Sequence, residues 1–249
     1  MLNKTRIYDD KVDIDNTEVK SFFEKRASIK DLTSVLLGNQ KDSKHSDLRN
    51  IKELTFLKSF INDFKDLSVL DIGCGMGRWA NNLKNEIRLY HGIDFSENFV
   101  SLNKEQYKNY NNIKFMLMSA SDMDLSKLDS SYDLIIIKGV LMYVNDDKLG
   151  DIFCNLKILS PHYIYIKESI SILNDRLTLK NFYSQKLDTE YNAIYRTKSE
   201  YEYYFKNILK DYKIQNTDLL LDKDTGAKEE TNAQYWFMIN KNFDIEKLY

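Results

Sequence analysis

The sequence predicts an α/β fold whose sheet is doubly wound and has seven strands, mostly parallel and ending in an antiparallel hairpin. From residue 68 onward, short apolar runs alternate with segments of helical periodicity, the order typical of a parallel sheet covered by helices on both faces. The first apolar run passes directly into a turn with three glycines. The last two apolar runs, Ile214–Leu221 and Gln234–Ile239, are joined by a loop too short for a crossover helix, which predicts the hairpin.

Length and composition indicate a globular chain with no specialised partner. The 249 residues suffice for one large α/β domain or for a domain with an added cap. The 36 basic residues nearly balance the 38 acidic ones, so we expect no broad basic surface and no nucleic-acid partner. No apolar run approaches the roughly 20 residues of a membrane span, and the first residues lack the apolar stretch of a signal peptide. Two cysteines form no disulfide framework. We therefore expect a cytoplasmic protein without a membrane span; its oligomeric state is not revealed by the sequence.

Residues 1–66 are predicted to lie outside the sheet, as a polar arm over residues 1–14 followed by two covering helices. Asn16 or Thr17 is a candidate cap for the first helix, which carries apolar residues at helical spacing: Val19, Phe22, Phe23 and Ala27. A polar loop, Gly38–Ser46, leads to the second helix, whose expected buried stripe is Leu48, Ile51, Leu54, Leu57 and Ile61. Because the sheet does not need these helices, we expect them to cover the mouth of a pocket.

Residues 67–249 are predicted to form the sheet domain, in one compact unit with the covering helices. We expect its parallel strands near 68–72, 88–93, 113–118, 132–138 and 162–168, and the helices between them near 78–86, 97–109 and 146–159. Residues 170–212 are mostly polar and aromatic, which favours a helical insertion that includes Glu200–Leu209. An aromatic stripe in that segment has helical spacing and is predicted to pack in the core: Tyr201, Tyr204, Phe205 and Ile208.

The segment Val69–Ala80 carries the most specific signal in the chain. Asp71 ends the first apolar strand, and Gly73, Gly75 and Gly77 follow at alternate positions, where they let the backbone turn sharply beside a ligand. Asp94 ends the second apolar strand, 17 residues beyond Gly77, and is placed to reach a ribose. The alternative is a tight turn that binds nothing. A dinucleotide fingerprint would have its third glycine where Arg78 stands, which argues against an oxidoreductase.

This pattern is similar to motif I of class I S-adenosylmethionine-dependent methyltransferases. The resemblance covers roughly residues 68–241 and implies a Rossmann-like fold with S-adenosylmethionine as cofactor and S-adenosylhomocysteine as product. It implies that Asp71 helps to hold the ammonium group of the cofactor, that Asp94 binds both ribose hydroxyls, and that Phe95 packs on the adenine. The glycine turn and Arg78 would lie beneath the amino acid part of the cofactor.

Two later segments are expected to complete the cofactor site. After the third strand, the resemblance implies that the backbone of Ala120 and Ser121 and the side chain of Asp122 hold the adenine edge. This chain has Ser119 where the family often has Asp, so Asp122 as a helix-capping residue stays an alternative. At the end of the fourth strand, Lys138 and Gly139 should border the reacting methyl group, because ligands of open α/β sheets bind at the carboxyl ends of the strands.

Several residues are candidates for catalysis. The chain lacks both an Asn/Asp-Pro-Pro-Tyr run and a Pro-Cys pair, which argues against methylation of planar nitrogens and of cytosine C5. Tyr143, where similar enzymes often have His, is either a substrate contact or a core residue. Glu168 ends the fifth strand and is a candidate general base or an ion-pair partner of Lys167 or Lys138. His45, in the loop between the covering helices, is a weaker candidate.

Other polar groups are not expected to take part in catalysis. His91 lies inside the second strand and His162 at the start of the fifth, so both are interpreted as structural. The spacing of His, Cys and acidic residues indicates no metal site.

The acceptor is predicted to be a small polar molecule, methylated on oxygen or nitrogen. Arg26, in the segment Phe22–Ala27, and the pair Tyr195–Arg196 resemble acceptor-pocket elements of similar enzymes, and two arginines would suit a phosphate or carboxylate. Each arginine is alternatively a surface charge. A weaker resemblance is to small bacterial methyltransferases of capsular polysaccharide assembly, including phosphoramidate modification, and it implies a sugar, a nucleotide-linked sugar or a phosphoramidate as acceptor. An RNA methyltransferase and a non-catalytic cofactor-binding regulatory protein are the competing readings.

Overall fold

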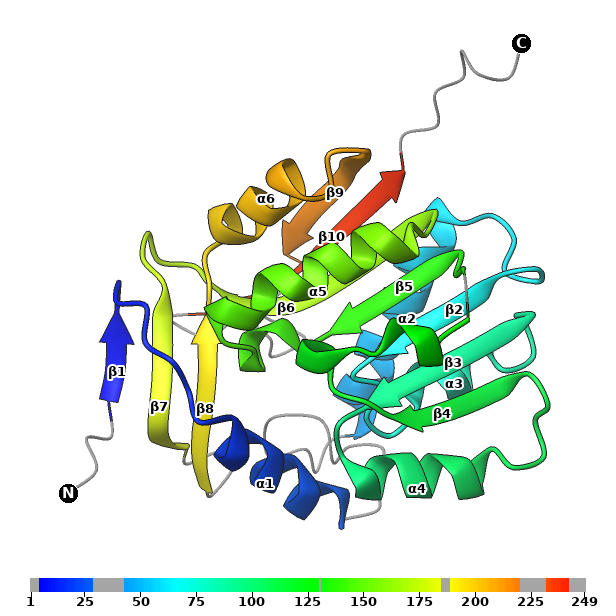
Figure 1. The fold of residues 1–249 in the computed structure, drawn as a ribbon, viewed down its shortest axis with the longest axis horizontal. Helices are drawn as coiled ribbons and strands as arrows, with labels where there is room; N and C mark the ends of the chain where they lie inside the picture. Colours follow the sequence, from blue (N-terminus) through cyan, green and yellow to red (C-terminus); the bar gives the residue numbers. More distant parts are fainter. Residues whose placement is uncertain (1–4, 29–42, 130, 185–188, 220–231, 242–249) are drawn as a thin grey trace.

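The computed structural model describes residues 5–28, 43–129, 131–184, 189–219 and 232–241 (Figure 1). Its main sheet has seven strands in the order β4-β3-β2-β5-β6-β10-β9. The strands are β2 (Ser68–Ile72), β3 (Leu89–Asp94), β4 (Ile113–Leu117), β5 (Leu134–Lys138), β6 (Tyr163–Ser171), β9 (Tyr212–Leu219) and β10 (Asn232–Lys241). The first five run parallel, whereas β10 pairs antiparallel with both β6 and β9. The predicted α/β sheet with its antiparallel final pair is therefore confirmed.

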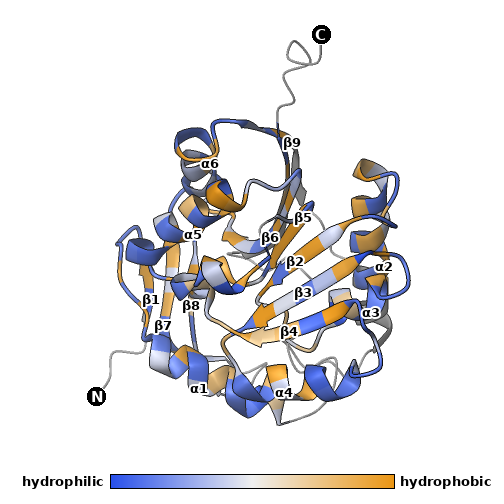
Figure 2. Ribbon diagram, turned by 45° about the vertical axis from the view of Figure 1, so that its right-hand side comes forward, coloured by the Kyte–Doolittle hydropathy of each residue, from blue (hydrophilic) through white to orange (hydrophobic). Residues whose placement is uncertain are grey.

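Both faces of this sheet are covered because side chains along a strand point alternately to opposite faces. In β5, Leu134 and Ile136 belong to one hydrophobic cluster, with α2 (Ser43–Phe60) and α3 (Arg78–Leu83). Ile135 and Ile137 belong to the other, with α5 (Asp146–Leu159) and α6 (Lys198–Asn207). Figure 2 shows hydrophobic residues along the central strands and mixed hydropathy along the helices, as expected of a buried sheet between amphipathic layers. Tyr201 and Phe205 of α6 are buried, so the predicted core stripe is confirmed for these two residues.

The short segments at the carboxyl ends of the strands also have regular structure. Helix α4 (Glu97–Gln106) begins after Ser96, whose hydroxyl accepts a hydrogen bond from Phe99 N at 3.2 Å. Three single turns of 3₁₀ helix follow later strands: η1 (Ala120–Asp122), η2 (Leu125–Lys127) and η3 (Leu141–Tyr143). Helix α6 begins with a capping box between Thr197 and Glu200.

The first covering helix, α1 (Asn16–Ala27), lies between β8 and α4 (Figure 1). Its cap is Asp15, whose Oδ1 accepts from Thr17 N at 2.8 Å and from Glu18 N at 3.3 Å, rather than Asn16 or Thr17 as expected. A carboxylate at this position satisfies two backbone N–H groups at once, which explains the earlier start.

The second covering helix, α2, buries only part of the predicted stripe. Leu57 and Ile61 are buried, but Leu48 is 40% exposed and Ile51 is 61% exposed, so this part of the prediction is wrong. The buried face instead includes Glu53, whose partners are described below. The helix begins at Ser43, so the end of the predicted loop is helical, while residues 38–42 lie outside the described residues.

A second sheet occupies much of the region expected to be irregular or helical. Strands β1 (Thr5–Tyr8), β7 (Leu177–Ser184) and β8 (Thr189–Tyr195) pair antiparallel in the order β1-β7-β8. The polar arm therefore contains a strand, and the insertion is helical only in its final third, in α6. Alternating residues such as Leu177 and Leu179 are buried against the 140–144 segment and α1, and this burial stabilises strands in a sequence that looks polar.

Because β1 pairs with β7, the start of the chain is part of the same structural layer as the insertion. The domain boundary between residues 66 and 67 stays a prediction. Within the described ranges, no helix combines the length and the apolar character that a membrane span needs.

Candidate active site

A cavity of about 390 Å³ lies at the carboxyl ends of β2, β3, β5 and β6, beneath α1. Its size falls in the range of small-molecule and cofactor sites, roughly 300–1,000 Å³. Its place is the one that open parallel sheets use for ligands, where the strand order reverses between β2 and β5. The cavity is therefore the candidate site.

The turn after β2 forms one wall of the cavity and needs its glycines. Gly73, Gly75 and Gly77 all have positive φ, at 74°, 50° and 68°. A Cβ on Gly73 would lie 2.3 Å from Val140 Cγ2, so the turn packs tightly on the segment after β5. Asn103 of α4 is buried and donates from Nδ2 to Gly75 O at 2.6 Å.

Sequence reasoning missed Asn103. The available signal was a polar residue at i+4 from Phe99 and i+3 from Val100, on the buried face of α4.

Asp94 closes β3 beside this turn. Its Oδ2 accepts a hydrogen bond from Gly75 N and its Oδ1 one from Ser96 N, both at 2.9 Å. Burial raises the pKa of Asp94 to about 6 despite these two bonds. Each carboxylate oxygen retains an acceptor position, so the group suits two neighbouring hydroxyls.

Asp71 lines the cavity on the other side of the turn and is also buried. It accepts a hydrogen bond from the Tyr90 hydroxyl at 2.5 Å, while burial raises the pKa of Asp71 to about 7. Lys138 and Arg78 lower this pKa, but burial outweighs them; a buried carboxyl group that faces a cavity is suited to a cationic ligand group, because an ammonium would favour the ionised form.

The far end of the cavity is lined by apolar and small residues. Phe95, Ala120 and Ser121 lie there as expected, together with Met118 and Ser119. Ser119 caps η1 by accepting from Ser121 N at 3.3 Å. The side chain of Asp122 is exposed and does not line the cavity, so it is not placed to contact an adenine ring there. The cap of η1 is Ser119, not Asp122.

These residues fit S-adenosylmethionine. The paired acceptor positions of Asp94 suit a ribose diol, the buried Asp71 suits an ammonium, and Phe95 with Met118 suits an adenine ring. The glycine turn leaves bare main chain between them, with positive φ angles and close packing on Val140 and Asn103 that side chains on Gly73 and Gly77 would disturb. Arg78, Lys138 and Gly139 line the same cavity, so the structure brings these predicted cofactor residues together.

Lys138 and Lys167 both donate hydrogen bonds to Glu53 of α2. The sequence suggested an ion pair between Glu168 and Lys138 or Lys167, whereas both lysines bind Glu53. Glu53 was not found from the sequence, because a glutamate within an amphipathic helix is normally interpreted as part of its solvated face.

Glu168 lines the cavity, but both of its oxygens are engaged. Oε1 accepts from Val140 N at 2.9 Å and from Leu141 N at 3.1 Å, and Oε2 accepts from Met142 N at 3.2 Å. Burial raises the pKa of Glu168 to about 7, against the effect of these three bonds. This geometry favours a positioning role for Glu168 over the predicted role of general base.

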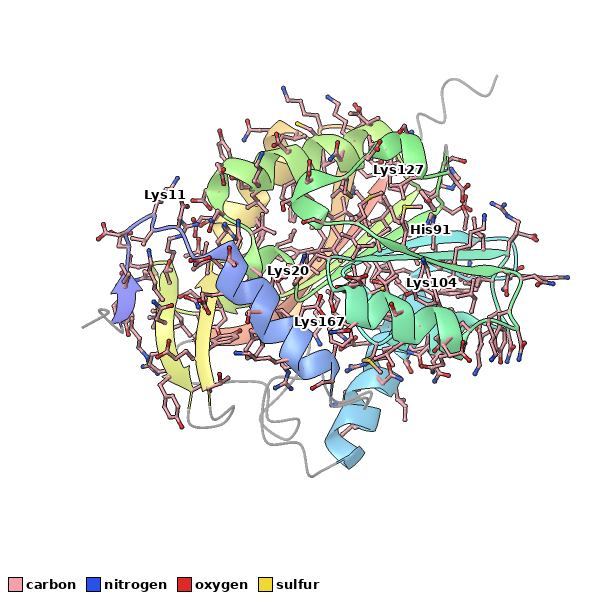
Figure 3. The ribbon with its side chains drawn as sticks, turned by 60° about the horizontal axis from the view of Figure 1, so that its bottom comes forward. Lys11, Lys20, His91, Lys104, Lys127 and Lys167 are labelled. Carbon is pink, nitrogen blue, oxygen red and sulfur yellow. The ribbon has the colours of Figure 1, made fainter. Side chains whose placement is uncertain are left out.

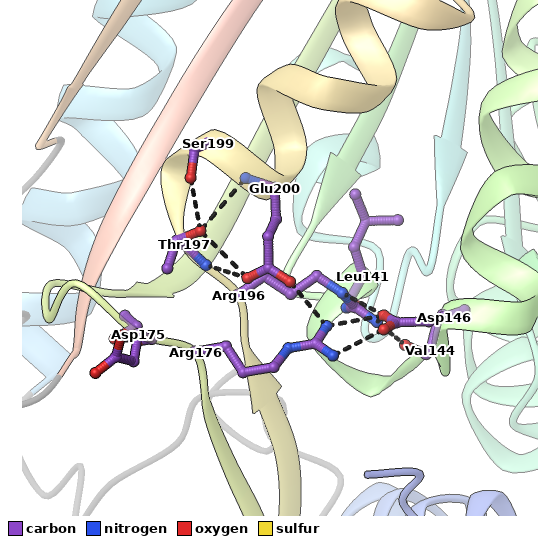
Figure 4. Close-up of polar contacts among 10 residues, drawn as sticks. Leu141, Val144, Asp146, Asp175, Arg176, Arg196, Thr197, Ser199 and Glu200 are labelled. Carbon is purple, nitrogen blue, oxygen red and sulfur yellow. Dashed lines mark hydrogen bonds and ion pairs between the residues drawn. The ribbon is translucent and has the colours of Figure 1, made fainter. Parts of the chain in front are cut away.

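Arg196 holds the same segment from its carbonyl side (Figure 4). The guanidinium donates from Nη1 to Leu141 O at 2.8 Å and from Nη2 to Val144 O at 2.7 Å, and it pairs with Asp146. Arg176 binds Asp146 as well, with N–O distances of 2.7 and 2.8 Å. Arg196 is 1% exposed and does not line the cavity, so the expectation that it binds substrate is corrected.

Tyr143 is carried into the cavity by the segment 140–144. Its hydroxyl lies 2.9 Å from the Tyr191 hydroxyl, and its ring meets Phe23 of α1 edge to face at 5.0 Å between centroids. Burial raises the pKa of Tyr143, so the phenol is neutral at physiological pH. Tyr195 is buried in the neighbouring cluster and does not line the cavity.

The remaining candidates lie away from the cavity wall. The Arg26 guanidinium is 5.5 Å from the Phe22 ring centroid, and neither residue lines the cavity, although their neighbour Phe23 does. His45 lies in α2 rather than in a loop, and its side chain is outside the described residues. His91 Nδ1 is 2.9 Å from the Tyr132 hydroxyl, and His162 Nδ1 is 3.4 Å from Asp133 Oδ1. Over the described ranges, no cluster of His, Cys, Asp and Glu could hold a metal ion.

Comparison with known proteins connects this site to a family. The family model of the methyltransferase domain matches residues 69–159, from β2 to the end of α5. Phosphoethanolamine N-methyltransferase 1 of Arabidopsis thaliana is 32% identical over 108 residues, 43% of this chain and 22% of that protein. A ubiquinone biosynthesis O-methyltransferase of Rickettsia bellii is 27% identical over 194 residues, 76% of each chain. The chain thus spans only about a fifth of the length of the plant relative.

A solved structure shows the same fold. Phosphoethanolamine N-methyltransferase 1 of Haemonchus contortus, in complex with phosphoethanolamine and S-adenosylhomocysteine, has a TM-score of 0.71 at 19% identity. The match covers 92% of this chain and 49% of that one. Fold, cavity and family model agree on one cofactor: the chain contains a class I S-adenosylmethionine-dependent methyltransferase domain.

Proposed function

We propose that the protein transfers a methyl group from S-adenosylmethionine to an oxygen or nitrogen of a small polar acceptor that carries an anionic group. The observation that carries this proposal is the charge of the cavity wall. Among the described lining residues, four are basic, Lys20, Arg78, Lys138 and Lys167, and three are acidic, Asp71, Asp94 and Glu168. Asp71 and Asp94 are accounted for by the ammonium and the ribose of the cofactor.

The acidic lining groups also carry less negative charge at neutral pH than their number suggests. Burial raises the pKa values of Asp71 and Glu168 to about 7, so neither group is fully ionised at neutral pH. Basic groups therefore outnumber fully ionised acids among the described lining residues, while the buried Glu53 carboxylate offsets part of the charge of Lys138 and Lys167; this balance supports an anionic acceptor. The names of several relatives also support an anionic acceptor, since those proteins act on phosphoethanolamine, a phosphate ester.

The arrangement of the side chains favours a positioning mechanism. When bound, S-adenosylmethionine supplies a methyl group on a positively charged sulfur, which is already an activated leaving group. The chain then has to orient the acceptor and exclude water. Helix α1 covers the cavity, with Phe23 in edge-to-face contact with both Phe95 and Tyr143.

No strong general base is evident in the described lining. It contains no histidine, Tyr143 is neutral, and Glu168 accepts three backbone hydrogen bonds. A phosphate or carboxylate oxygen is already anionic and needs no base, so acceptors of this kind match the site best.

The finer identity of the acceptor stays a proposal from sequence resemblance. The segment Phe22–Ala27 forms the second half of α1, beside the cavity, which supports a role in acceptor binding. Arg196 is engaged elsewhere, which removes one of the two arginines expected to bind an anion. A nucleotide-linked sugar or a phosphoramidate of capsular polysaccharide assembly has the proposed charge.

The test is a turnover assay with a matched acceptor panel. The protein and S-adenosylmethionine are incubated with phosphoethanolamine, phosphoramidates, nucleotide-linked sugars and uncharged sugars or phenols, and S-adenosylhomocysteine is quantified. We expect turnover with at least one anionic acceptor and its loss in Asp94→Ala. Turnover restricted to uncharged acceptors would contradict the proposed charge preference, and stimulation by RNA alone would favour the RNA methyltransferase alternative.

A further inference from the structure

A second cavity, of about 260 Å³, lies between α1 and β8, beside the cavity that the cofactor residues line. Val19 and Tyr143 line both cavities, so the two meet at these residues. The volume of the second cavity is below the roughly 300–1,000 Å³ of typical small-molecule sites, so it has room for only part of a ligand. It is therefore an extension of the main cavity rather than a complete site.

Helix α1 faces both cavities with different side chains. Those that line the main cavity are Asn16, Val19, Lys20 and Phe23. Those that line the second cavity, apart from the shared Val19, are Glu18, Ser21, Phe22 and Lys25. Each set follows the i, i+3, i+4, i+7 spacing of one helical stripe, and a shift of two residues turns one stripe from the other by roughly 200°. The helix is thus a partition with one side toward each cavity.

Two buried tyrosines mark the place where the cavities meet. The Tyr143 hydroxyl lies 2.9 Å from the hydroxyl of Tyr191, which lines the second cavity and also hydrogen-bonds Tyr195. The Phe22 ring meets the Tyr191 ring edge to face, with 5.9 Å between centroids. A phenol has one donor and two acceptor positions, so the bond between Tyr143 and Tyr191 leaves positions for a ligand hydroxyl. A molecule that extends from one cavity into the other therefore passes a polar contact.

The described lining of the second cavity mixes donors and acceptors. Glu18 offers acceptors and Lys25 offers donors, while the hydroxyls of Ser21 and Thr189 offer both. An anion calls for donors and a cation for acceptors, whereas a hydroxyl group both donates and accepts. The Phe22 ring adds an apolar surface for C–H groups. This lining matches a ligand part with several hydroxyls on a carbon ring or chain.

We propose that the second cavity binds the non-reacting part of the acceptor, and that this part is a sugar ring or another polyol. The inference rests on the proposed function. The residues assigned to the cofactor, from Asp71 to Ser121, extend along the main cavity, so the acceptor approaches the methyl group from the side of Tyr143. Figure 3, in which Lys20 is labelled, shows α1 between the strands of the second sheet and α4. One helix thus covers the cofactor on one side and borders the acceptor on the other.

Calorimetry with matched phosphates tests this assignment. Glucose 6-phosphate and cyclohexylmethyl phosphate carry the same anionic group on a six-membered ring, but only the first has ring hydroxyls. Both are titrated into the S-adenosylhomocysteine complex, together with uridine diphosphate glucose as a nucleotide-linked sugar. Ser21→Trp fills the second cavity from α1. Thr17→Trp is the matched control, because Thr17 is an exposed residue of the same helix and lines neither cavity.

We expect at least one sugar probe to bind about tenfold or more tightly than cyclohexylmethyl phosphate, the scale of one or two hydrogen bonds. Ser21→Trp should weaken that sugar probe at least about tenfold, the same scale, whereas Thr17→Trp should change it less than about twofold. The affinity for S-adenosylhomocysteine should stay the same in both variants. Tyr191→Phe, which keeps the ring and removes the hydroxyl, should also weaken the sugar probe.

Two results would overturn the assignment. One is that neither sugar probe binds the unsubstituted protein more tightly than cyclohexylmethyl phosphate. The other is an unchanged affinity for the sugar probe in Ser21→Trp, or in Tyr191→Phe if Ser21→Trp also loses S-adenosylhomocysteine and is therefore damaged. These titrations need no turnover. Methyl transfer to phosphoethanolamine without any preference for sugars would leave the proposed function in place and remove the second cavity as its acceptor site.

Discussion

Arg196 offers the sharpest test of how the site is built. The guanidinium bonds the carbonyls of Leu141 and Val144 and pairs with Asp146, on the opposite side of the 140–144 segment from Glu168. Arg196→Met keeps an unbranched side chain of moderate length but removes every donor. If the structure is right, the variant loses stability. If Arg196 binds the acceptor, it loses acceptor affinity instead.

The expected loss follows from the groups left behind. The Val144 carbonyl loses its charged donor, and leaving a buried polar group unsatisfied costs about 1–3 kcal/mol, whereas the Leu141 carbonyl keeps the bond from Val144 N at 3.2 Å. Asp146 keeps the bidentate contact from Arg176, so the cost falls short of a fully broken buried ion pair, about 3–5 kcal/mol. We expect the free energy of unfolding to fall by about 4 kcal/mol, a large share of the typical 5–15 kcal/mol.

Urea unfolding at fixed pH measures this loss, with Arg88→Met as the control. The Arg88 side chain is 58% exposed and donates to Asp66 O at 3.0 Å, so its replacement should cost less than about 0.5 kcal/mol. A loss below 1 kcal/mol in Arg196→Met, together with an increased KM for the acceptor at unchanged affinity for S-adenosylhomocysteine, would refute the positioning role.

Three further predictions concern the cofactor end and its pH dependence. Gly73→Ala should weaken the binding of S-adenosylhomocysteine at least tenfold, because φ is 74° and the new Cβ would lie 2.3 Å from Val140 Cγ2. Calorimetry measures the affinity, with Gly150→Ala, where a Cβ meets nothing within 4 Å, as the control. Equal affinity in both variants would contradict the tight turn. Burial raises the pKa of Asp71 to about 7 and that of Asp94 to about 6, and the ligand binds the ionised forms, so affinity for S-adenosylhomocysteine should fall as pH decreases through 7 and then through 6. Asp94→Asn should bind more weakly and lose only the step near pH 6, and retention of that step in the variant would exclude Asp94 as the titrating group. Burial raises the pKa of Glu168 from 4.5 to about 7, so the folded state binds the proton of Glu168 more tightly than the unfolded state does. The resulting stabilisation, up to about 3 kcal/mol, is complete below pH 4.5 and is lost as pH rises through 7. Glu168→Gln should flatten this part of the pH–stability curve measured by urea unfolding, and an unchanged slope would contradict the assignment.

The parts of this protein that depend on local pattern were predicted well. The five parallel strands, the hairpin and the glycine turn follow from hydrophobic periodicity and from glycines at fixed spacing, both properties of short segments. The same pattern placed Asp71 and Asp94 at strand ends, and parallel strands necessarily bring their carboxyl ends to one edge. The cofactor half of the cavity was therefore readable from the sequence.

The three-stranded sheet was missed for a reason that concerns packing. β1 and β7 lie more than 160 residues apart in the chain, and their strands are polar by composition. They form strands because the sheet buries alternate residues against α1 and the 140–144 segment, and such tertiary burial overrides local propensity.

The sequence by itself determined the order of strands and helices in the main sheet, the glycine turn and the two acids at strand ends, because each depends on neighbours in the chain. Only the tertiary structure decided the partners of the charged residues. Glu53 meets Lys167 across 114 residues, and Arg196 meets Leu141 across 55. The residue type limits which hydrogen bonds and ion pairs a side chain is able to form. Burial and distance in the folded chain determine which of them it does form. For this reason Glu168 and Arg196, chosen from the sequence as base and substrate ligand, are found holding the backbone that carries Tyr143 into the cavity.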